Sequence, residues 1–353
     1  MTSFNPVRAA YNYVVGFSDQ QNQEIAEKIN DAISELFNNS ASDLNELFKK
    51  FPDEVIAALK QRETPPLCEA VKKNLVRMVP ELLKIIPSEI DTPNSEGFTP
   101  SMLAAKQGSD SLVRALLSGG ADMQKVDATG CTALMWAVLS GIVELVRSLL
   151  GAGAGAISSV DVQNKDGNTA LMLAVMNMKE SGSDDFLKAE MTARALLDSG
   201  KVNVTLANKA GDTALGLMAS QPAFSRRVAY SLYTEGADLS AQNHKGRAPI
   251  VLASRSGNAE AVRFLIEHMQ KEGIDIDMKD NRGRTALYYA TVDGNADIAK
   301  QLVHAGADLL SMDEKAIGEL GKRVGADEIG RLQRATDGNG LGDKTPSIDA
   351  SNT

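Results

Sequence analysis

Side chains that could do chemistry are few in this sequence, and their spacing assembles no reaction centre. The three histidines, His244, His268 and His304, lack the spacing of metal ligands. The two cysteines, Cys68 and Cys131, have neither a neighbouring histidine nor a C-x-x-C partner. No Ser/His/Asp set and no catalytic carboxylate pair is recognisable. We therefore predict no catalytic residue and no metal ligand, and a protein that is not an enzyme.

Two glycine-rich stretches resemble phosphate-binding loops without the required context. Residues 151–156 match the letters G-x-G-x-x-A, but residues 143–150 before them read as a helix, whereas a dinucleotide-binding motif follows a strand. Residues 338–345 resemble a phosphate loop, but Asp343 occupies the place of the glycine that precedes the lysine. Neither stretch predicts a nucleotide site, so no cofactor is expected.

Composition and charge are those of an ordinary folded protein. The 353 residues are 43% hydrophobic and 24% charged, and 46 acidic residues against 37 Lys and Arg give a net charge of −9. This acidic balance weighs against a general nucleic-acid binder, and no apolar run is long enough to span a membrane. Two cysteines cannot form a disulfide framework, and residues 1–18 make a poor secretion signal. We therefore expect a cytoplasmic protein.

The elements that would have to position any binding site follow an internal repeat. The phrase Gly-x-Thr, followed by Ala or Pro and an apolar run, occurs six times, once with Ala in place of Thr; it begins at Gly97, Gly130, Gly167, Gly211, Gly246 and Gly283. Successive Thr positions are 33, 37, 44, 35 and 37 residues apart. A period of this length with insertions is typical of stacked repeats, in which each unit buries its apolar face only against its neighbours.

These repeats resemble the ankyrin repeat, whose signature is T-P-L-H-x-A. The closest copy is T-P-S-M-L-A-A at residues 99–105, followed by Gly108 and by Gly-Ala-Asp at residues 120–122. The resemblance covers residues 64–312, with six clear copies and a degenerate first copy around residues 66–70. It implies an all-α repeat solenoid of stacked helix-turn-helix repeats with hairpin-like loops. The expected repeats lie near residues 64–91, 94–123, 127–161, 164–205, 208–240, 243–277 and 280–312.

Single residues sharpen the expectations for these repeats. A Thr at the start of each signature can cap a helix, whereas Ala248 cannot, so we expect a weaker helix start there. The fourth repeat carries an insertion around residues 177–190, which predicts an exposed loop. Cys68 is predicted to be a small core residue, whereas Cys131 is predicted to lie in an exposed loop as the more accessible thiol.

The segments that flank the repeats differ from them in pattern. Residues 1–63 contain short amphipathic helices, which favour a helical N-terminal cap over a small separate interaction module. Residues 313–335 read as C-terminal capping helices. Residues 336–353 are rich in Gly, Asp, Ser and Thr, which predicts a disordered tail.

The resemblance also implies where a partner binds, because ankyrin-like proteins contact partners along a concave face of loop tips and first helices. Over the five face positions per repeat, formal charges sum to zero in the second to fifth repeats, +3 in the sixth and +1 in the seventh, with histidine neutral. This asymmetry predicts a basic patch near the C-terminal end, where Arg can bind carboxylates in a bidentate way. The alternative is a set of solvated loop charges with no partner. The candidate contact residues are Trp136, Lys165, His244, Lys245, Arg247, Arg255, Arg282, Arg284 and Tyr288.

Aromatic residues on this face have two possible roles. Trp136 either packs between neighbouring first helices or anchors a partner. The same alternatives apply to Tyr288 and Tyr289, of which only one can point fully inward.

The sequence favours a non-catalytic scaffold or adaptor that binds a protein partner with an acidic peptide or surface. We expect a monomer with no membrane span that binds no nucleic acid. One alternative is a bacterial effector delivered into a host cell without a Sec signal, which rests on family analogy and the polar tail. The other is a regulatory or enzymatic subunit that uses residues 1–63.

Overall fold

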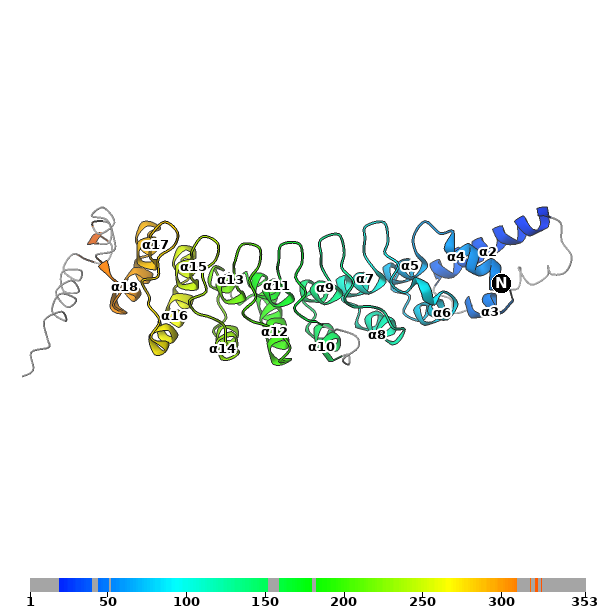
Figure 1. Cartoon of the computed structure of the whole chain (residues 1–353). Helices are drawn as coiled ribbons and strands as arrows, with labels where there is room; N and C mark the ends of the chain where they lie inside the picture. Colours follow the sequence, from blue (N-terminus) through cyan, green and yellow to red (C-terminus); the bar gives the residue numbers. More distant parts are fainter. Residues whose placement is uncertain are drawn as a thin grey trace, which may run out of the picture. The chain divides into compact units, whose positions relative to one another are not determined.

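The computed structural model describes residues 19–39, 44–50, 52–151, 159–179 and 182–309, together with the single residues 318, 321, 322 and 325. The described residues contain helices and turns but no strand, apart from one isolated bridge between Ala207 and Thr213. The helices (Figure 1) are α2 (Asp19–Asn39), α3 (Leu44–Lys50), α4 (Pro52–Lys60), α5 (Pro66–Lys72), α6 (Met78–Ile85), the 3₁₀ turn η1 (Pro87–Glu89), α7 (Pro100–Gln107), α8 (Asp110–Ser118), α9 (Ala133–Ser140), α10 (Val143–Gly151), α11 (Ala170–Met176), α12 (Asp184–Asp198), α13 (Ala214–Ala219), α14 (Arg226–Thr234), α15 (Pro249–Ser256), α16 (Ala259–Glu272), α17 (Ala286–Val292) and α18 (Ala296–His304).

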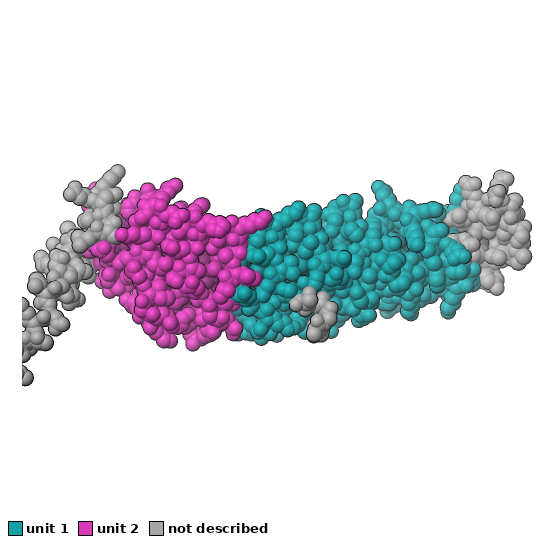
Figure 2. All heavy atoms as spheres, viewed as in Figure 1, with its two compact units in different colours: residues 1–177, 183–203 teal, residues 178–182, 204–353 magenta. Residues whose placement is uncertain are grey.

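Contacts divide the chain into two compact units, coloured separately in Figure 2. The first unit comprises residues 1–177 and 183–203 and the second comprises residues 178–182 and 204–353. The first unit holds α2 to α12, and the second holds α13 to α18. The residues that form the predicted basic patch all belong to the second unit.

Within each unit, helices pair in sequence and the pairs stack on one another. In the first unit α5 packs against α7 and α7 against α9, while α6 packs against α8 and α8 against α10. In the second unit α13, α15 and α17 form one row and α14, α16 and α18 another, and long loops project from the row of first helices (Figure 1). The predicted all-α repeat solenoid is therefore confirmed, with turns rather than strands in its loops.

Small and aliphatic side chains form the core between the pairs. Ala104, Ala137 and Ala174 in the first unit, and Ala253 and Ala290 in the second, are completely buried. An alanine at these positions lets neighbouring first helices approach closely, which bulkier side chains would prevent. The low aromatic content of the sequence follows from this packing.

The insertion in the fourth repeat is only partly the exposed loop that the sequence predicted. Helix α12 begins at Asp184, inside that insertion, and is longer than most second helices in the described residues. The start of α12 is determined locally, because the Ser183 hydroxyl accepts a hydrogen bond from the backbone N–H of Phe186. Asp184 and Asp185 lie in the first turn, where the helix dipole stabilises negative charge. The insertion therefore lengthens α12 from Asp184 onward, while its described residues before Ser183 are not helical.

Several segments with sequence predictions lie partly or wholly outside the described residues. Gly151 ends α10, and residues 152–158 of the glycine-rich stretch are not described. The tail at 336–353 and, apart from single residues, the segment 313–335 are also outside. At the other end, α3 packs against α6, the second helix of the first pair, and α2 packs against α4. No helix in the described ranges is both long and apolar enough to cross a bilayer.

Five first helices begin with a threonine whose hydroxyl accepts a hydrogen bond from the backbone N–H three residues later; these are Thr99, Thr132, Thr169, Thr213 and Thr285. At the sixth such position, Ala248 has the same extended backbone but no side-chain cap. There the backbone N–H of Val251 donates to the carbonyl oxygen of Ala248 at 3.0 Å.

These caps support a stability prediction. Replacing Thr285 by Ala should lower the free energy of unfolding by about 1 kcal/mol, because one N–H at the helix start loses its acceptor. Introducing the missing hydroxyl with Ala248→Thr should stabilise by less than that amount, because the N–H of Val251 already has a partner. Urea unfolding followed by circular dichroism measures both, and equal, opposite effects would contradict this explanation.

Candidate partner-binding site

The loops that carry the candidate contact residues are shaped by an Asn or Asp three residues before each repeat glycine. In every case the side-chain Oδ1 accepts hydrogen bonds from the backbone N–H groups two and four residues later. None of these residues was predicted to shape the loops, although their regular position before the glycine is a usable signal in the sequence. The six residues are Asn94, Asp127, Asn164, Asn208, Asn243 and Asp280.

The loops of the sixth and seventh repeats lie very close together. Gly246 has a φ of +71°, and a Cβ atom at this position would lie 2.6 Å from the backbone nitrogen of Asn281. The N–H of Asn281 donates to the carbonyl oxygen of Lys245 at 3.0 Å, and its side-chain amide donates to the carbonyl oxygen of His244 at 3.0 Å. Glycine at 246 is thus required both for its backbone conformation and for the approach of the next loop.

Asp280 connects the seventh loop to its own first helix and to the sixth loop. Its Oδ2 accepts a hydrogen bond from the Tyr289 hydroxyl at 2.6 Å and lies 3.7 Å from Nε of Arg247. Burial alone would raise the pKa of Asp280, but the hydrogen bonds from Tyr289, Arg284 and Arg282 and the charge of Arg247 hold it below its ordinary value. Asp280 is therefore ionised at neutral pH and fixes Arg247 beside it.

Asp127 makes the corresponding arrangement in the first unit. Its Oδ1 accepts hydrogen bonds from the backbone N–H and hydroxyl of Thr129, and its Oδ2 accepts from Nε1 of Trp136 at 2.9 Å. Burial would raise the pKa of Asp127, but these hydrogen bonds, with one from the backbone of Cys131, lower it. In both repeats, the loop residue is an aspartate and the first helix places an aromatic hydrogen-bond donor nine residues after it. The pairs are Asp127 with Trp136 and Asp280 with Tyr289.

Three arginines surround the tyrosine pair of the seventh repeat. The guanidinium of Arg284 lies 5.0 Å from the ring centre of Tyr288, and those of Arg247 and Arg255 lie 5.7 Å and 5.1 Å from the ring centre of Tyr289. Arg planes at such distances from aromatic rings gain cation–π stabilisation. The rings thus hold the arginines on the surface formed by the loop tips and first helices of the sixth and seventh repeats, which we call the basic loop face.

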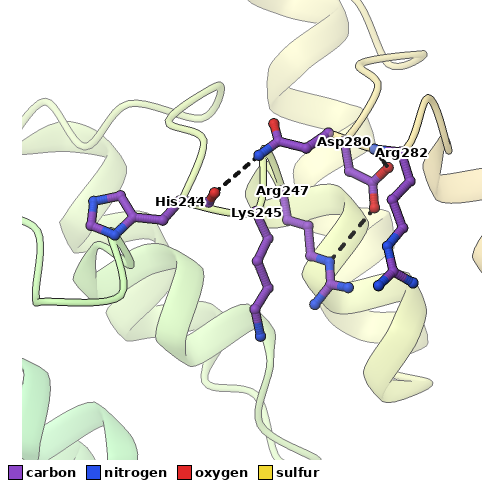
Figure 3. A pocket seen from close by; sticks show the side chains of 6 residues that line it. His244, Lys245, Arg247, Asp280 and Arg282 are labelled. Carbon is purple, nitrogen blue, oxygen red and sulfur yellow. Dashed lines mark hydrogen bonds and ion pairs between the residues drawn. The ribbon is translucent and has the colours of Figure 1, made fainter.

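A pocket of about 240 Å³ opens within the basic loop face. The side chains of Lys245, Arg247 and Arg282 extend from their two loops in the same direction, and Asp280 lies between the two arginines (Figure 3). The full lining consists of His244, Lys245, Arg247, Asp280, Asn281 and Arg282.

The structure brings together seven of the nine candidate contact residues, all in the second unit: His244, Lys245, Arg247, Arg255, Arg282, Arg284 and Tyr288. Of the tyrosine pair, Tyr289 is buried and Tyr288 half-buried. Sequence reasoning missed Asp280, because its ion pair with Arg247 depends on a contact between two repeats.

Trp136 and Lys165 belong to the first unit and are not part of this cluster. Trp136 is half-buried and packs edge-on against Phe98, with ring centres 5.3 Å apart. Nζ of Lys106 lies 4.5 Å from the Phe98 ring centre and 4.8 Å from that of Trp136. Together with its hydrogen bond to Asp127, these contacts support the packing role for Trp136 over the partner anchor.

The prediction that Cys131 is the accessible thiol is wrong. Its side chain is only 5% exposed, because the loop folds around Asp127 and because Nδ2 of Asn164 in the next loop lies 3.8 Å from its Sγ. Cys68 is buried as predicted, and burial raises the pKa of its thiol to about 12. The described residues contain no group of three or more His, Cys, Asp or Glu side chains that could hold a metal ion.

Comparisons with known proteins identify the helix pairs as repeats of a known family. The family model for ankyrin repeats matches residues 67–158 and 215–313. The chain is 29% identical over 179 residues to "Ankyrin repeat and KH domain-containing protein mask-1" of Caenorhabditis elegans, which is 51% of this chain and 6% of that protein. It is 36% identical over 118 residues to "Ankyrin repeat and SAM domain-containing protein 6" of Rattus norvegicus, which is 33% of this chain and 13% of that protein.

A solved structure shows the same architecture. The ankyrin repeat domain of Bcl-3, described as a unique member of the IkappaB protein family, superposes with a TM-score of 0.52 at 25% identity, over 64% of this chain and 99% of that chain. The chain spans only a small part of the two curated relatives, so their other domains are not represented in these matches. Because the family model matches more than half of the residues and the helix pairs stack as the family requires, the chain belongs to the ankyrin-repeat family.

Proposed function

We propose that this protein is a non-catalytic scaffold that binds an acidic segment of a partner protein on its basic loop face. Ankyrin repeats form protein–protein interaction domains, and the family typically consists of interaction scaffolds without catalysis. The proposal adds the location of the site and the charge of the partner.

The observation that carries the proposal is a set of cations that make no salt bridge. Within the described residues, Lys245, Arg255, Arg282 and Arg284 make no salt bridge, although all four lie on the same face. By contrast, Arg226 at the start of α14 pairs with Glu267 of α16 at 2.6 Å. Unpaired cations held near one another raise the local potential, which attracts acidic segments and speeds their association.

The test is a charge reversal that spares the structure. Lys245→Glu, Arg255→Glu and Arg282→Glu are combined, because these three side chains are exposed and make no salt bridge in the described part of the chain. Arg247 is left unchanged, since a glutamate there would place a second carboxylate next to buried Asp280. Binding of a fluorescein-labelled octaglutamate probe, measured by fluorescence anisotropy, should weaken by at least about tenfold, and more at low salt.

A matched variant separates local from global charge effects. Arg263→Glu, Lys271→Glu and Lys300→Glu change the net charge by the same amount on exposed positions of α16 and α18, the second helices. This control should bind the probe nearly as well as the unaltered protein. Equal loss in both triple variants, or no loss in the first, would show that the basic loop face is not the binding site.

A further inference from the structure

The pocket in the basic loop face offers three cationic groups to a single ligand. Lys245 and Arg247 come from the sixth loop and Arg282 from the seventh, and all three extend in the same direction (Figure 3). The two loops are joined by the hydrogen bonds of Asn281 to the carbonyl oxygens of Lys245 and His244. The spacing of the cations is therefore set by the protein before a ligand arrives, which lowers the cost of binding.

The cations in this pocket are available to a ligand because the single acidic group turns inward. Asp280 accepts hydrogen bonds from two backbone N–H groups and from Tyr289, and its side chain is 1% exposed. Arg247 directs Nε toward Asp280, which leaves its two terminal nitrogens for a ligand. Lys245 and Arg282 make no salt bridge among the described residues.

Side chains, and not the backbone, would have to recognise that ligand. The N–H groups of Lys245 and Arg247 donate to Oδ1 of Asn243, and that of Arg282 donates to Oδ1 of Asp280. These loops therefore differ from a glycine-rich phosphate loop, in which free N–H groups cradle the anion. A site made of Arg and Lys side chains suits an anion with several acceptor oxygens.

The charge balance favours a dianion over a single carboxylate. Lys245, Arg247 and Arg282 contribute three positive charges and Asp280 one negative charge, so the pocket has a net charge of +2 with His244 neutral. A phosphorylated side chain carries a charge of about −1.5 to −2 at neutral pH and three acceptor oxygens. A glutamate or aspartate would neutralise only half of this charge.

We infer that this pocket binds one phosphorylated side chain of the partner protein. The inference rests on the proposed function, to which it adds the group that is recognised and the residues that recognise it. Lys245, Arg247 and Arg282 hold the phosphoryl oxygens, and Asp280 is the positioning residue that keeps the Arg247 guanidinium at the pocket.

The test compares short probes on the full chain. Acetyl-Gly-phosphoserine-Gly-amide, acetyl-Gly-Glu-Gly-amide and inorganic phosphate are titrated into ²H,¹⁵N-labelled protein, and amide signals of residues 244–247 and 281–283 are followed by NMR. We expect the phosphoserine probe to shift these signals with a dissociation constant at least about tenfold lower than that of the glutamate probe, because it carries the second negative charge.

Single substitutions locate the site. Lys245→Gln and Arg282→Gln should each weaken phosphoserine binding by about threefold or more, since each removes one cation. Lys209→Gln is the matched control: Lys209 is an exposed loop lysine of the fifth repeat that does not line the pocket, and its loss should leave binding unchanged.

Each other outcome overturns a different claim. If the octaglutamate probe binds but phosphoserine is no better than glutamate, the phosphoryl site is wrong and the acidic-partner proposal stands. If inorganic phosphate binds as tightly as the phosphoserine probe, the pocket takes a free anion and not a side chain of a partner. If neither the octaglutamate nor the phosphoserine probe binds, both proposals fail.

Discussion

Replacing Asp280 by alanine is expected to lower the free energy of unfolding of the second unit by about 3 kcal/mol. The substitution removes the acceptor of the Tyr289 hydroxyl, leaves two loop N–H groups without their side-chain partner, and deprives Arg247 of its nearby carboxylate. Because Arg247 is itself only 13% exposed, its charge would lose compensation in a poorly hydrated place. Urea unfolding followed by circular dichroism gives the stability change.

The repeats themselves supply the control for this variant. Asp280→Asn places at 280 the residue that four other loops carry, at Asn94, Asn164, Asn208 and Asn243. Its amide oxygen can still accept from the two loop N–H groups, so the loss should be about 1 kcal/mol and should come from Tyr289 and Arg247 alone. Equal losses in the Ala and Asn variants would mean that the loop hydrogen bonds contribute nothing to stability.

Acid should narrow the difference in stability between the Asp280→Ala variant and the unaltered protein. The folded-state pKa of Asp280 is lowered from an ordinary value of 3.8, so its ionised form stabilises the fold above that value. This contribution is lost as the pH falls through the lowered folded-state pKa. The stability gap measured at pH 7 should therefore narrow below about pH 4, and a gap that widens in acid would contradict the assignment.

Replacing Phe264 by alanine is expected to destabilise the second unit by about 3 to 5 kcal/mol. Phe264 lies on α16, is completely buried, stacks on His268 with ring centres 4.1 Å apart, and lies 5.7 Å from the ring of Phe224. Truncation leaves a cavity that its helical neighbours cannot fill, because they are fixed by the repeats on either side. Thermal and urea unfolding measure the loss.

Two further variants test whether this loss comes from the cavity. Phe264→Leu keeps much of the buried volume and should cost about 1.5 kcal/mol or less. Val292→Ala removes apolar atoms from a side chain that is 52% exposed, and it should change stability by no more than about 0.5 kcal/mol. Similar losses of stability for Phe264→Ala and Phe264→Leu would show that the lost buried volume is not the cause.

The candidate site was predictable in part. The net charge of the face positions identified the basic cluster, because those positions recur at fixed places in each repeat and their side chains project from loops and first helices. The same reasoning placed Trp136 and Lys165 with the others, yet they lie in another unit. Cys131 was also predicted to be exposed. The structure buries this residue because the next loop covers it.

The sequence alone determined the repeat, its helices and most of their starts. A threonine cap is a hydrogen bond between residues three apart in the sequence, and a positive φ is a property of the glycine itself. Both features therefore depend only on residues that are close along the chain. The start of α12 at Asp184 was equally local, through Ser183, although the sequence analysis assigned that insertion to a loop.

Only the tertiary structure decided which basic residues lie around one pocket. Arg247 and Asp280 are 33 positions apart, and they meet because the sixth and seventh loops stack at the close approach that Gly246 allows. Such a contact depends on the offset between successive repeats, which the stacked cores set and no single repeat encodes. The number and charge of the basic side chains therefore follow from the sequence, whereas the stacking of the repeats turns three of them toward one pocket.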